Sequence, residues 1–366
     1  MKKIALIGST GSIGRQVLRV VKNHPDHFKI VALVANAPSE EFDRQLREFT
    51  PEFYALASSD KESALCAAEI DCADVIFNAA GGFAGLGYSL RAIKAGKVLA
   101  LANKETLVCG GDLILPEIAG RGGEIVPVDS EHSAIWQCLN FRKNDRINRL
   151  IITASGGAFR GLKPEELKYV TPEQALNHPT WKMGKKITVD SATLMNKGYE
   201  VIEAHVLFGT PYCDIQTVIQ PQSIVHSMVE FEDGAILAQM SYPTMELPIQ
   251  LALTWPERLN CELPSMDFTK AFSLKFEPLE RADFPLYDLT LKCGEAGGIM
   301  PCVLNAADEV AVHAFLEKGI AYTDIFKVVD SVISATENEK VTSFEQLVET
   351  DKSARAKAQK IIDKYI

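Results

Sequence analysis

Short apolar runs alternate with longer amphipathic stretches over the first 150 residues of the chain. The runs predict strands, and the stretches between them, such as 13–22 and 86–95, predict helices. Strands that alternate with helices in this way form a parallel sheet with right-handed crossovers. The strands predicted in this part of the chain are 4–7, 30–34, 75–78, 98–102, 125–128 and 150–153.

The pattern changes after this region. A helix is predicted over 192–208, and strand-like runs follow at 217–219, 224–231 and 235–241. A proline-rich, irregular stretch precedes purely helical periodicity, as at 305–317 and 322–334. The sequence therefore predicts an α/β protein in which a parallel sheet, a mixed α/β domain and a C-terminal helical bundle follow one another. The predicted segments are a first domain over 1–128, a catalytic domain over 129–255, a connector over 256–286 and a helical domain over 287–366.

Length and charge narrow the class of protein. A chain of 366 residues is too long for one compact core. Its net charge of −10 argues against binding nucleic acid or an anionic membrane through the surface as a whole. Eight scattered cysteines without a Cys-x-x-Cys pair suit reduced thiols, and no apolar run is long enough to span a membrane. We expect a cytoplasmic protein.

The segment G-S-T-G-S-I-G, residues 8–14, follows the first strand and opens a helix. Glycines at this position let the backbone turn tightly and approach a pyrophosphate, which indicates a Rossmann-like dinucleotide-binding domain. The alternative is a tight turn without a ligand. The second strand ends V-A-L-V-A-N-A-P, without the acid that would accept from the ribose of NAD. That absence favours NADP, although no Arg or Lys follows directly.

Two acids follow the predicted strand at 124–128, in V-P-V-D-S-E-H-S-A. If the strand continued, Asp129 and Glu131 would point to the same face and would repel each other unless a cation lay between them. An arbitrary pair of this kind is more often two solvated acids. The position at the carboxyl end of a parallel strand, where ligands bind, favours a functional pair here.

A third acid lies in T-V-D-S-A-T-L-M-N-K-G-Y-E, residues 188–200. Asp190 or Ser191 is predicted to cap the helix. Asn196 and Glu200 are four residues apart and share a face, with Lys197 beside them. The alternative is an ordinary Lys–Glu pair on the protein surface.

Two further segments carry polar groups suited to a phosphate. A-S-G-G-A, residues 154–158, ends a strand with a serine and two glycines, which can form an anion-binding nest. H-P-T-W-K-M-G-K-K, residues 178–186, has the composition of a mobile basic lid. Without a ligand, Trp181 would be a half-buried surface anchor and His178 a hydrogen-bonding residue at a helix end.

Taken in order, these motifs resemble those of the 1-deoxy-D-xylulose 5-phosphate reductoisomerases. The resemblance covers essentially the whole chain and rests on G-S-T-G-S-I-G, A-N-K-E, V-D-S-E-H-S-A, A-S-G-G, H-P-x-W-x-M-G, V-D-S-A-T-x-M-N-K and L-N-A-A-D-E-V-A-V. It implies an NADP-dependent oxidoreductase that isomerises 1-deoxy-D-xylulose 5-phosphate, a small phosphorylated sugar, through a carbon shift. Reduction with NADPH then gives 2-C-methyl-D-erythritol 4-phosphate, in isoprenoid biosynthesis. The family is a homodimer of three-domain subunits.

The resemblance also implies roles for individual residues. Asp129, Glu131 and Glu200 would bind one divalent cation, Mg, Mn or Co, that polarises the substrate, and oxygen ligands suit such hard cations. Lys104 and Ser130 would contact the substrate's oxygens. The catalytic set is Lys104, Asp129, Glu131, Glu200 and His178, and the substrate-binding set is Lys104, Ser130, Glu131, Ser155, His178, Trp181, Ser191, Asn196, Lys197 and Glu200, with Met183 also part of the lid.

The cofactor-binding set implied by the resemblance is Thr10, Gly11, Ser12, Ile13, Asn36, Asn103, Glu105, Gly184 and Met245. The chain departs from the family after the second strand, where Asn36, Ala37 and Pro38 replace a pattern that includes a basic residue. Glu246 also stands where an arginine is common. Two rivals are an aspartate-semialdehyde or homoserine dehydrogenase relative, and a nonenzymatic dinucleotide sensor. Neither explains the three acids together with the S-A-T-L-M-N-K segment.

Overall fold

The structure, a computed structural model, describes residues 1–121, 123–141 and 146–365. The chain forms two compact units, which are described separately. Unit 1 contains Met1–Thr106, Gly111–Ser133 and Thr244–Leu263, and unit 2 contains Leu107–Gly110, Ala134–Pro243 and Pro264–Ile366. Within the described ranges, every helix is too short or too polar to cross a bilayer.

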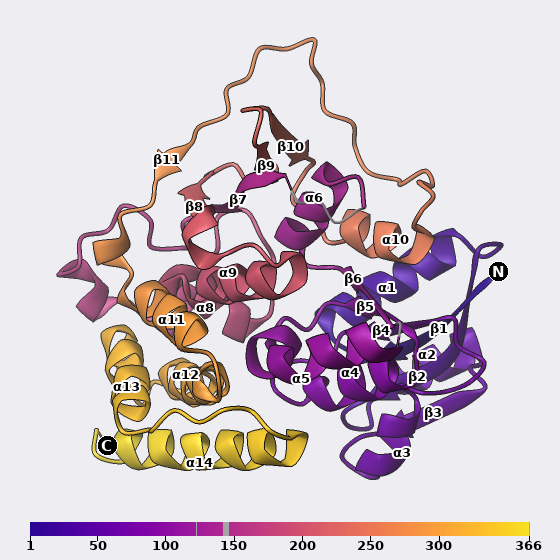
Figure 1. The fold of residues 1–366 in the computed structure, drawn as a ribbon, viewed down its shortest axis with the longest axis horizontal. Coiled ribbons are helices and arrows are strands. Elements are labelled where there is room, and N and C mark those ends of the chain that lie inside the picture. The colour runs from indigo at the N-terminus through magenta and orange to yellow at the C-terminus, as the bar shows by residue number, and fades with distance from the viewer. Residues whose placement is uncertain (122, 142–145, 366) are drawn as a thin grey trace. The chain divides into compact units, whose positions relative to one another are not determined.

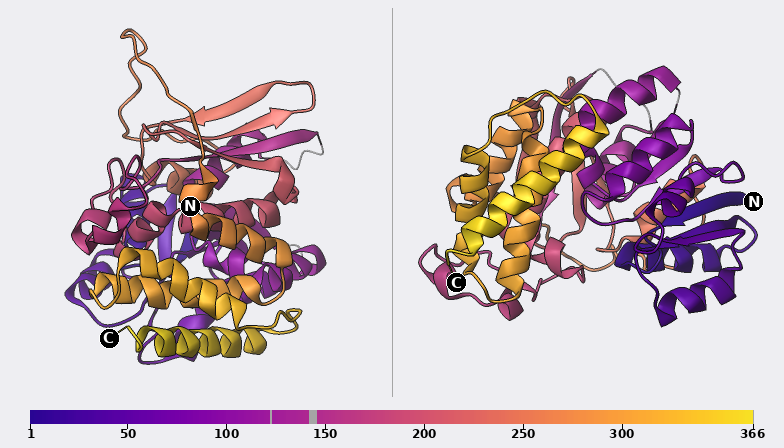
Figure 2. Two further views of the ribbon diagram at one scale, coloured as in Figure 1. Left: turned by 90° about the vertical axis from the view of Figure 1, so that its left-hand side faces the viewer. Right: turned by 90° about the horizontal axis from the view of Figure 1, so that it is seen from below.

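A six-stranded parallel sheet forms the centre of unit 1 (Figures 1 and 2), with the strand order β3-β2-β1-β4-β5-β6. β1 pairs with β2 on one side and with β4 on the other, so the strand order reverses between β1 and β4. Ligands of such sheets bind at the carboxyl ends of the strands at this switch point. The strands are β1 (Lys2–Ile7), β2 (Phe28–Ala35), β3 (Phe53–Leu56), β4 (Val75–Asn78), β5 (Val98–Leu101) and β6 (Glu124–Pro127).

The helices of unit 1 bury one face against this sheet. In α1, the buried residues Val17, Leu18 and Val21 recur at helical spacing. α10 comes from a distant part of the sequence and contacts both α1 and β6. The helices are α1 (Ser12–Asn23), α2 (Glu40–Phe49), α3 (Lys61–Cys66), α4 (Gly85–Lys94) and α10 (Glu246–Thr254), while α5 (Glu105–Arg121) and α6 (Ser130–Cys138) have residues assigned to each of the two units.

All six segments predicted as strands in the first 150 residues are strands, and five of them form this sheet. The segment 150–153 belongs to β7 in the sheet of unit 2, and the sixth position is taken by β3, which the apolar pattern did not reveal. β3 is four residues long and lies at the edge, where Phe53 and Tyr54 are not buried. A short, half-exposed edge strand has little hydrophobic signal.

Unit 2 contains a mixed five-stranded sheet with the order β10-β9-β7-β8-β11. β7 and β8 are parallel, whereas β9 pairs with both β7 and β10 in antiparallel fashion. One face of this sheet buries Leu150 and Ile152 in a core shared with Val201 and Ala204. The strands are β7 (Ile147–Ala154), β8 (Ile215–Ile219), β9 (Val225–Phe231), β10 (Ile236–Met240) and β11 (Glu277–Pro278).

The C-terminal helices of unit 2 are arranged around α12, which contacts α8, α11, α13 and α14. α12 is nearly enclosed, and its buried residues include Leu304, Ala307 and Val312. Figure 1 shows these helices in orange and yellow. The predicted α/β fold with a C-terminal helical bundle is confirmed. The helices of unit 2 are α7 (Pro172–Ala175), α8 (Lys185–Thr193), α9 (Met195–Phe208), α11 (Pro285–Ala296), α12 (Met300–Leu316), α13 (Tyr322–Ser334) and α14 (Phe344–Ile362), with short 3-10 turns at Glu166–Tyr169, Tyr212–Asp214 and Arg281–Asp283.

Candidate functional site

The glycine loop lies at the switch point of the unit 1 sheet, between β1 and α1. Gly8 has a φ of +80°, and a Cβ added there would lie 2.5 Å from the carbonyl oxygen of Ala79. A Cβ on Gly14 would overlap the carbonyl of Gly8. α1 begins at Ser12 without a side-chain cap, so its first N–H groups are available to an anion. This geometry fits a pyrophosphate, and it holds four of the predicted cofactor residues, Thr10, Gly11, Ser12 and Ile13.

The cations near this loop are engaged with protein groups. The Nη1 atom of Arg15 donates to the carbonyl oxygen of Thr10 at 2.5 Å. Nη2 of Arg44 lies 2.9 and 2.7 Å from the two carboxylate oxygens of Glu41. At the end of β2, Asn36 and Ala37 are exposed and neither provides a charge. The end of β2 thus has neither the acid that would repel a 2′-phosphate nor a basic side chain of its own to bind one.

Two predicted cofactor residues follow β5. Asn103 is buried, and its Nδ2 atom donates to the carbonyl oxygen of Gly82 at 3.0 Å and to Oε2 of Glu105 at 2.8 Å. Asn103 therefore ties the turn after β5 to the turn after β4. Both turns lie at the carboxyl edge of the sheet, the edge that also holds the glycine loop.

α10 begins beside the predicted nicotinamide contact. Met245 occupies the N-cap of α10, and Glu246 is its first residue. Glu246 accepts hydrogen bonds from Nε and Nη2 of Arg19 on α1, at 3.0 and 2.9 Å. The acid at position 246 is thus explained by its partner, because the pair joins α10 to the helix that follows the glycine loop.

Asp129 and Glu131 are not on a strand. β6 ends at Pro127 and α6 begins at Ser130, so Asp129 precedes the helix and Glu131 lies in its first turn. The carbonyl oxygen of Asp129 accepts from the amide of Ser133 at 2.8 Å, the first bond of the helix. The argument from strand alternation is therefore wrong, because a helix nucleates immediately after the strand.

Unit 1 places a buried cation beside these acids. Nζ of Lys104 lies 2.5 Å from Oδ2 of Asp129, and only 7% of Lys104 is exposed. The hydroxyl of Ser130 donates to Oε2 of Glu131 at 2.6 Å. Lys104 is therefore not a solvated loop lysine. These four predicted residues lie around the start of α6.

The predicted helix over 192–208 is two helices. α8 ends at Thr193, Leu194 has a φ of +57°, and α9 begins at Met195. Asp190 and Ser191 lie inside α8, so the prediction that one of them caps the helix is wrong. The cause is the left-handed backbone at Leu194, a conformation that an apolar residue rarely adopts and that the sequence does not signal.

Asn196, Lys197 and Glu200 form a polar group on α9, where Asn196 and Glu200 share a face as their spacing predicted; Lys197 and Glu200 are buried and Asn196 is half-buried. Nδ2 of Asn196 donates to Oε1 of Glu200 at 2.5 Å, and Lys197 donates to Oε2. Glu200 is 1% exposed and Lys197 is 5% exposed. A surface Lys–Glu pair is therefore excluded. A buried carboxylate needs this compensation, because desolvation of an isolated charge is costly.

His178 and Ser155 form a second polar pair in unit 2. Nδ1 of His178 accepts from the amides of Thr180 at 3.2 Å and Trp181 at 3.0 Å, so it carries no proton. In the neutral ring the proton is then on Nε2, which lies 2.9 Å from the hydroxyl oxygen of Ser155 and donates to it. That oxygen also accepts from the amide of Gly157 at 3.2 Å, which leaves its own proton to be donated to an anion. Burial lowers the pKa of His178 and so favours the neutral ring.

The segment after His178 rests on the β8–β9 region. The hydroxyls of Thr180 and Ser223 are 3.0 Å apart, and the ring of Trp181 meets His226 edge-on at 6.0 Å. Gly184 is the N-cap of α8. The last two residues of the predicted lid, Lys185 and Lys186, are therefore helical, and the non-helical part is 178–184. Thr180, Ser223 and His226 were missed in the sequence because isolated polar residues there have no pattern.

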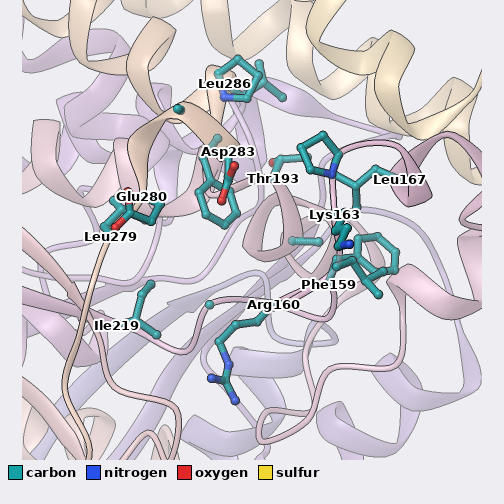
Figure 3. A pocket seen from close by; sticks show the side chains of 18 of the residues that line it. Phe159, Arg160, Lys163, Leu167, Thr193, Ile219, Leu279, Glu280, Asp283 and Leu286 are labelled. Carbon is teal, nitrogen blue, oxygen red and sulfur yellow. The ribbon is translucent and has the colours of Figure 1, made fainter.

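A cavity of about 590 Å³ also lies in unit 2 (Figure 3). It is lined by apolar side chains such as Phe159 and Leu286, with Arg160 and Asp283 among its polar ones. Gly156 and Thr193 line it as well, but none of the predicted substrate residues does. Neither His178 nor Ser155 is among the residues that line the cavity.

Several side chains of the described residues are candidate metal ligands. Asp129, Glu131 and Glu200 each offer one carboxylate oxygen, and His132 and Glu203 are further candidates. A set made only of carboxylate oxygens fits a hard divalent cation such as Mg²⁺. The residues present thus have the donor chemistry that the predicted metal requires.

Models of one protein family match most of the chain. Residues 4–70 and 57–111 match the 1-deoxy-D-xylulose 5-phosphate reductoisomerase model. Residues 125–208 match the C-terminal domain model of that name, and residues 240–357 match the DXP reductoisomerase C-terminal domain.

Individual relatives and solved structures give the same family. The reductoisomerase of Thermodesulfovibrio yellowstonii is 45% identical, covering 99% of this chain and 100% of that protein. That of Crocosphaera subtropica is 46% identical, covering 97% of this chain and 95% of that protein. The reductoisomerase of Zymomonas mobilis in complex with NADPH matches with a TM-score of 0.90 at 37% identity, over 99% of both chains. A DOX-P reductoisomerase in complex with NADPH, fosmidomycin and magnesium matches with a TM-score of 0.92 at 34% identity, over 99% of this chain and 98% of that one.

Proposed function

The chain belongs to the 1-deoxy-D-xylulose 5-phosphate reductoisomerase family, and we infer that it catalyses the reaction of that name. It isomerises 1-deoxy-D-xylulose 5-phosphate and reduces the product with NADPH to 2-C-methyl-D-erythritol 4-phosphate, a step of isoprenoid biosynthesis. Its cofactors are NADPH and one divalent cation.

The observation that carries this proposal is the polar group of half-buried Asn196 with buried Lys197 and Glu200 on α9. A helix in a packed core has no structural need for three polar side chains, and an apolar set would be at least as stable. The group is arranged so that one face of α9 offers an amide, an ammonium and a carboxylate. These are the groups needed to bind a phosphate beside a metal ligand.

We assign Asp129, Glu131 and Glu200 as the metal ligands. All three offer carboxylate oxygens, which supports their binding a hard divalent cation. When bound, the divalent cation polarises the substrate's oxygens as a Lewis acid. Magnesium is the ion that a solved relative contains, and manganese or cobalt would fit the same oxygen ligands.

The substrate's phosphate is assigned to the hydroxyls of Ser155 and Ser191 with Asn196 and Lys197. His178, held as the Nε2–H tautomer, orients the Ser155 hydroxyl so that its proton faces the anion. Lys104 and Ser130 contact the reacting end of the sugar, where Lys104 balances negative charge that develops on oxygen. Trp181 and Met183 cover the bound sugar and exclude water.

The cofactor is assigned to the carboxyl edge of the unit 1 sheet. Thr10, Gly11, Ser12 and Ile13 surround the pyrophosphate at the start of α1, and Asn36 lies on the ribose side. Asn103 and Glu105 shape the opposite wall. Gly184 and Met245 approach the nicotinamide. When bound, NADPH supplies the hydride.

The test of the proposal is turnover of the purified protein. With 1-deoxy-D-xylulose 5-phosphate, NADPH and Mg²⁺, we expect NADPH absorbance to fall and mass spectrometry to show the methylerythritol product. EDTA should stop the reaction, and added Mg²⁺ or Mn²⁺ should restore it. NADPH consumption without this product, or turnover that EDTA leaves unchanged, would contradict the assignment.

We also propose that the protein is a cytoplasmic homodimer. Ile236 and Leu237 on β10, the edge strand of the unit 2 sheet, are 52% and 50% exposed. Phe268 and Phe272 on the connector are also exposed. Exposed apolar side chains on an edge strand favour pairing with a second copy. A mass of one chain from light scattering would exclude the dimer. The eight free thiols support the cytoplasm, because that compartment keeps thiols reduced.

A further inference from the structure

An ionic cluster of two buried acids and one partly exposed lysine in unit 2 lies outside the predicted site residues. Nζ of Lys186 lies 2.6 Å from Oδ2 of Asp190 and 2.6 Å from Oδ2 of Asp308. The side chains of the two acids are 4% and 0% exposed. The same ammonium stands 5.2 Å from the centroid of the Tyr199 ring. The cluster therefore joins α8, which holds Lys186 and Asp190, to α9 and to the central helix α12.

Burying the carboxylates of this cluster costs desolvation free energy. Asp308 lies on α12 among buried apolar residues such as Leu304 and Val312. Burial raises the pKa of Asp308, and the nearby ammonium of Lys186 opposes that rise. Well-packed apolar residues in place of a buried ion pair are often as stable or more so, and ion pairs of this kind are best attested as devices that fix a register. The cluster is thus better explained by what it positions than by the stability that it contributes.

The elements that it fixes carry the proposed phosphate groups. Ser191 directly follows Asp190 on α8. A Cβ added to Gly157 would lie 2.5 Å from the carbonyl oxygen of Ser191, so the loop that holds Ser155 rests on the backbone of α8. At its other end α8 begins after Gly184, where the segment 178–184 ends. A shift of α8 would therefore move both serines and the end of the lid.

We propose that Asp308 is a positioning residue for the substrate's phosphate, which acts through Lys186 and Asp190 to hold α8. This clamp, formed by Lys186, Asp190 and Asp308, holds the Ser191 hydroxyl against the Ser155 loop before the substrate binds. This inference rests on the proposed function, which assigns those two serines to the phosphate. No pattern in the sequence predicts this role, because Asp308 lies in an apolar helix far from Lys186 along the chain.

The test compares two neighbouring acids on α12. Asp308→Asn removes the charge that holds Lys186 and keeps the shape of the side chain. Glu309→Gln is the matched control, because Glu309 pairs with Arg355 of α14, at 2.5 Å, and makes no ion pair with α8. Both variants lose one partly or fully buried ion pair, so both are expected to lower the melting temperature. Only Asp308→Asn is expected to loosen α8.

The readouts are kcat and KM for the sugar phosphate, the inhibition constant of inorganic phosphate, and the Kd of NADPH from fluorescence. In Asp308→Asn we expect KM and the phosphate constant each to rise about tenfold, with kcat and the NADPH Kd nearly unchanged. In Glu309→Gln all four should stay near those of the wild type. Lys186→Met should reproduce the effect of Asp308→Asn, and the double variant should add little to it.

Several outcomes would overturn the positioning role. One is an equal change in KM for Asp308→Asn and Glu309→Gln, and another is a loss of NADPH affinity in step with phosphate affinity. If Asp308→Asn does not fold, Lys186→Met, at a partly exposed position, decides the question by the same readouts. A wild-type protein that turns over the sugar phosphate while Lys186→Met leaves both phosphate constants unmoved refutes only the clamp. A wild-type protein that does not turn over the sugar phosphate refutes the proposed function. If that protein also fails to bind inorganic phosphate, the clamp is refuted as well.

Discussion

Position 37 provides the sharpest test of the cofactor site, because the chain lacks a basic residue there. Ala37 is exposed at the end of β2, where the adenosine ribose of a dinucleotide is expected. The nearby cations are already engaged, Arg15 with the Thr10 carbonyl and Arg44 with Glu41. Ala37→Lys should therefore add a contact to the 2′-phosphate that the wild type does not have.

The magnitude follows from the exposure of the site. A hydrogen bond to a charged group contributes about 1.5–3 kcal/mol, or roughly 10- to 100-fold in affinity. Because residue 37 is exposed, solvent and salt screen the new charge and the lower end applies. We expect NADPH to bind about tenfold more tightly to Ala37→Lys at low salt and by less at high salt. NADH, which has no 2′-phosphate, should bind nearly as before.

The assay is the ratio of kcat/KM for NADPH and NADH, together with the Kd of each cofactor from fluorescence. Ala37→Gln is the control, because it adds a side chain of similar length without a charge. We expect the wild type to prefer NADPH, by a narrower margin than Ala37→Lys. An unmoved ratio in Ala37→Lys would show that residue 37 does not face the phosphate. A wild type that prefers NADH would refute the inference about the cofactor itself.

Three further predictions concern the metal, the lid and pH. Glu200→Gln and Asp129→Asn should each lower metal-dependent turnover, while the NADPH Kd changes little. Loss of an outer-shell partner of a metal costs about 10- to 100-fold, and loss of a direct ligand should cost more. Near-normal turnover in either variant would contradict the ligand assignment. The segment 178–184 should be cleaved by protease in the free protein and protected by a phosphonate mimic of the substrate, and equal cleavage in both states would count against a lid. Burial lowers the pKa of His178, so its contribution to stability is complete above about pH 6.5 and is lost as the pH falls through the lowered value. The unfolding free energy of the wild type should therefore fall more steeply below pH 6.5 than that of His178→Asn, and parallel curves would refute this.

Local sequence determined the glycine loop and five of the six strands in the first sheet. Positions 8 and 14 require glycine, because a Cβ on Gly8 or Gly14 would overlap nearby backbone atoms, and the glycine spacing predicts this tight turn. The spacing of Asn196 and Glu200 likewise placed them on one face of a helix, where the structure joins them by a hydrogen bond. These features depend on residues near one another along the chain, so the pattern of the sequence is enough to predict them.

Only the tertiary structure decided which distant elements meet. The apolar run at 150–153 has the signal of a strand, but pairing with β8 and β9 assigns it to the second sheet. The left-handed backbone at Leu194 and the helix that starts at Ser130 were not predicted from the local pattern either. The ion pair between Lys186 and Asp308 joins two helices, and no periodic pattern in the sequence predicts it. Hydrophobic patterning specifies which face of an element is buried, whereas the identity of the partner across that face is fixed by the packing of the whole chain.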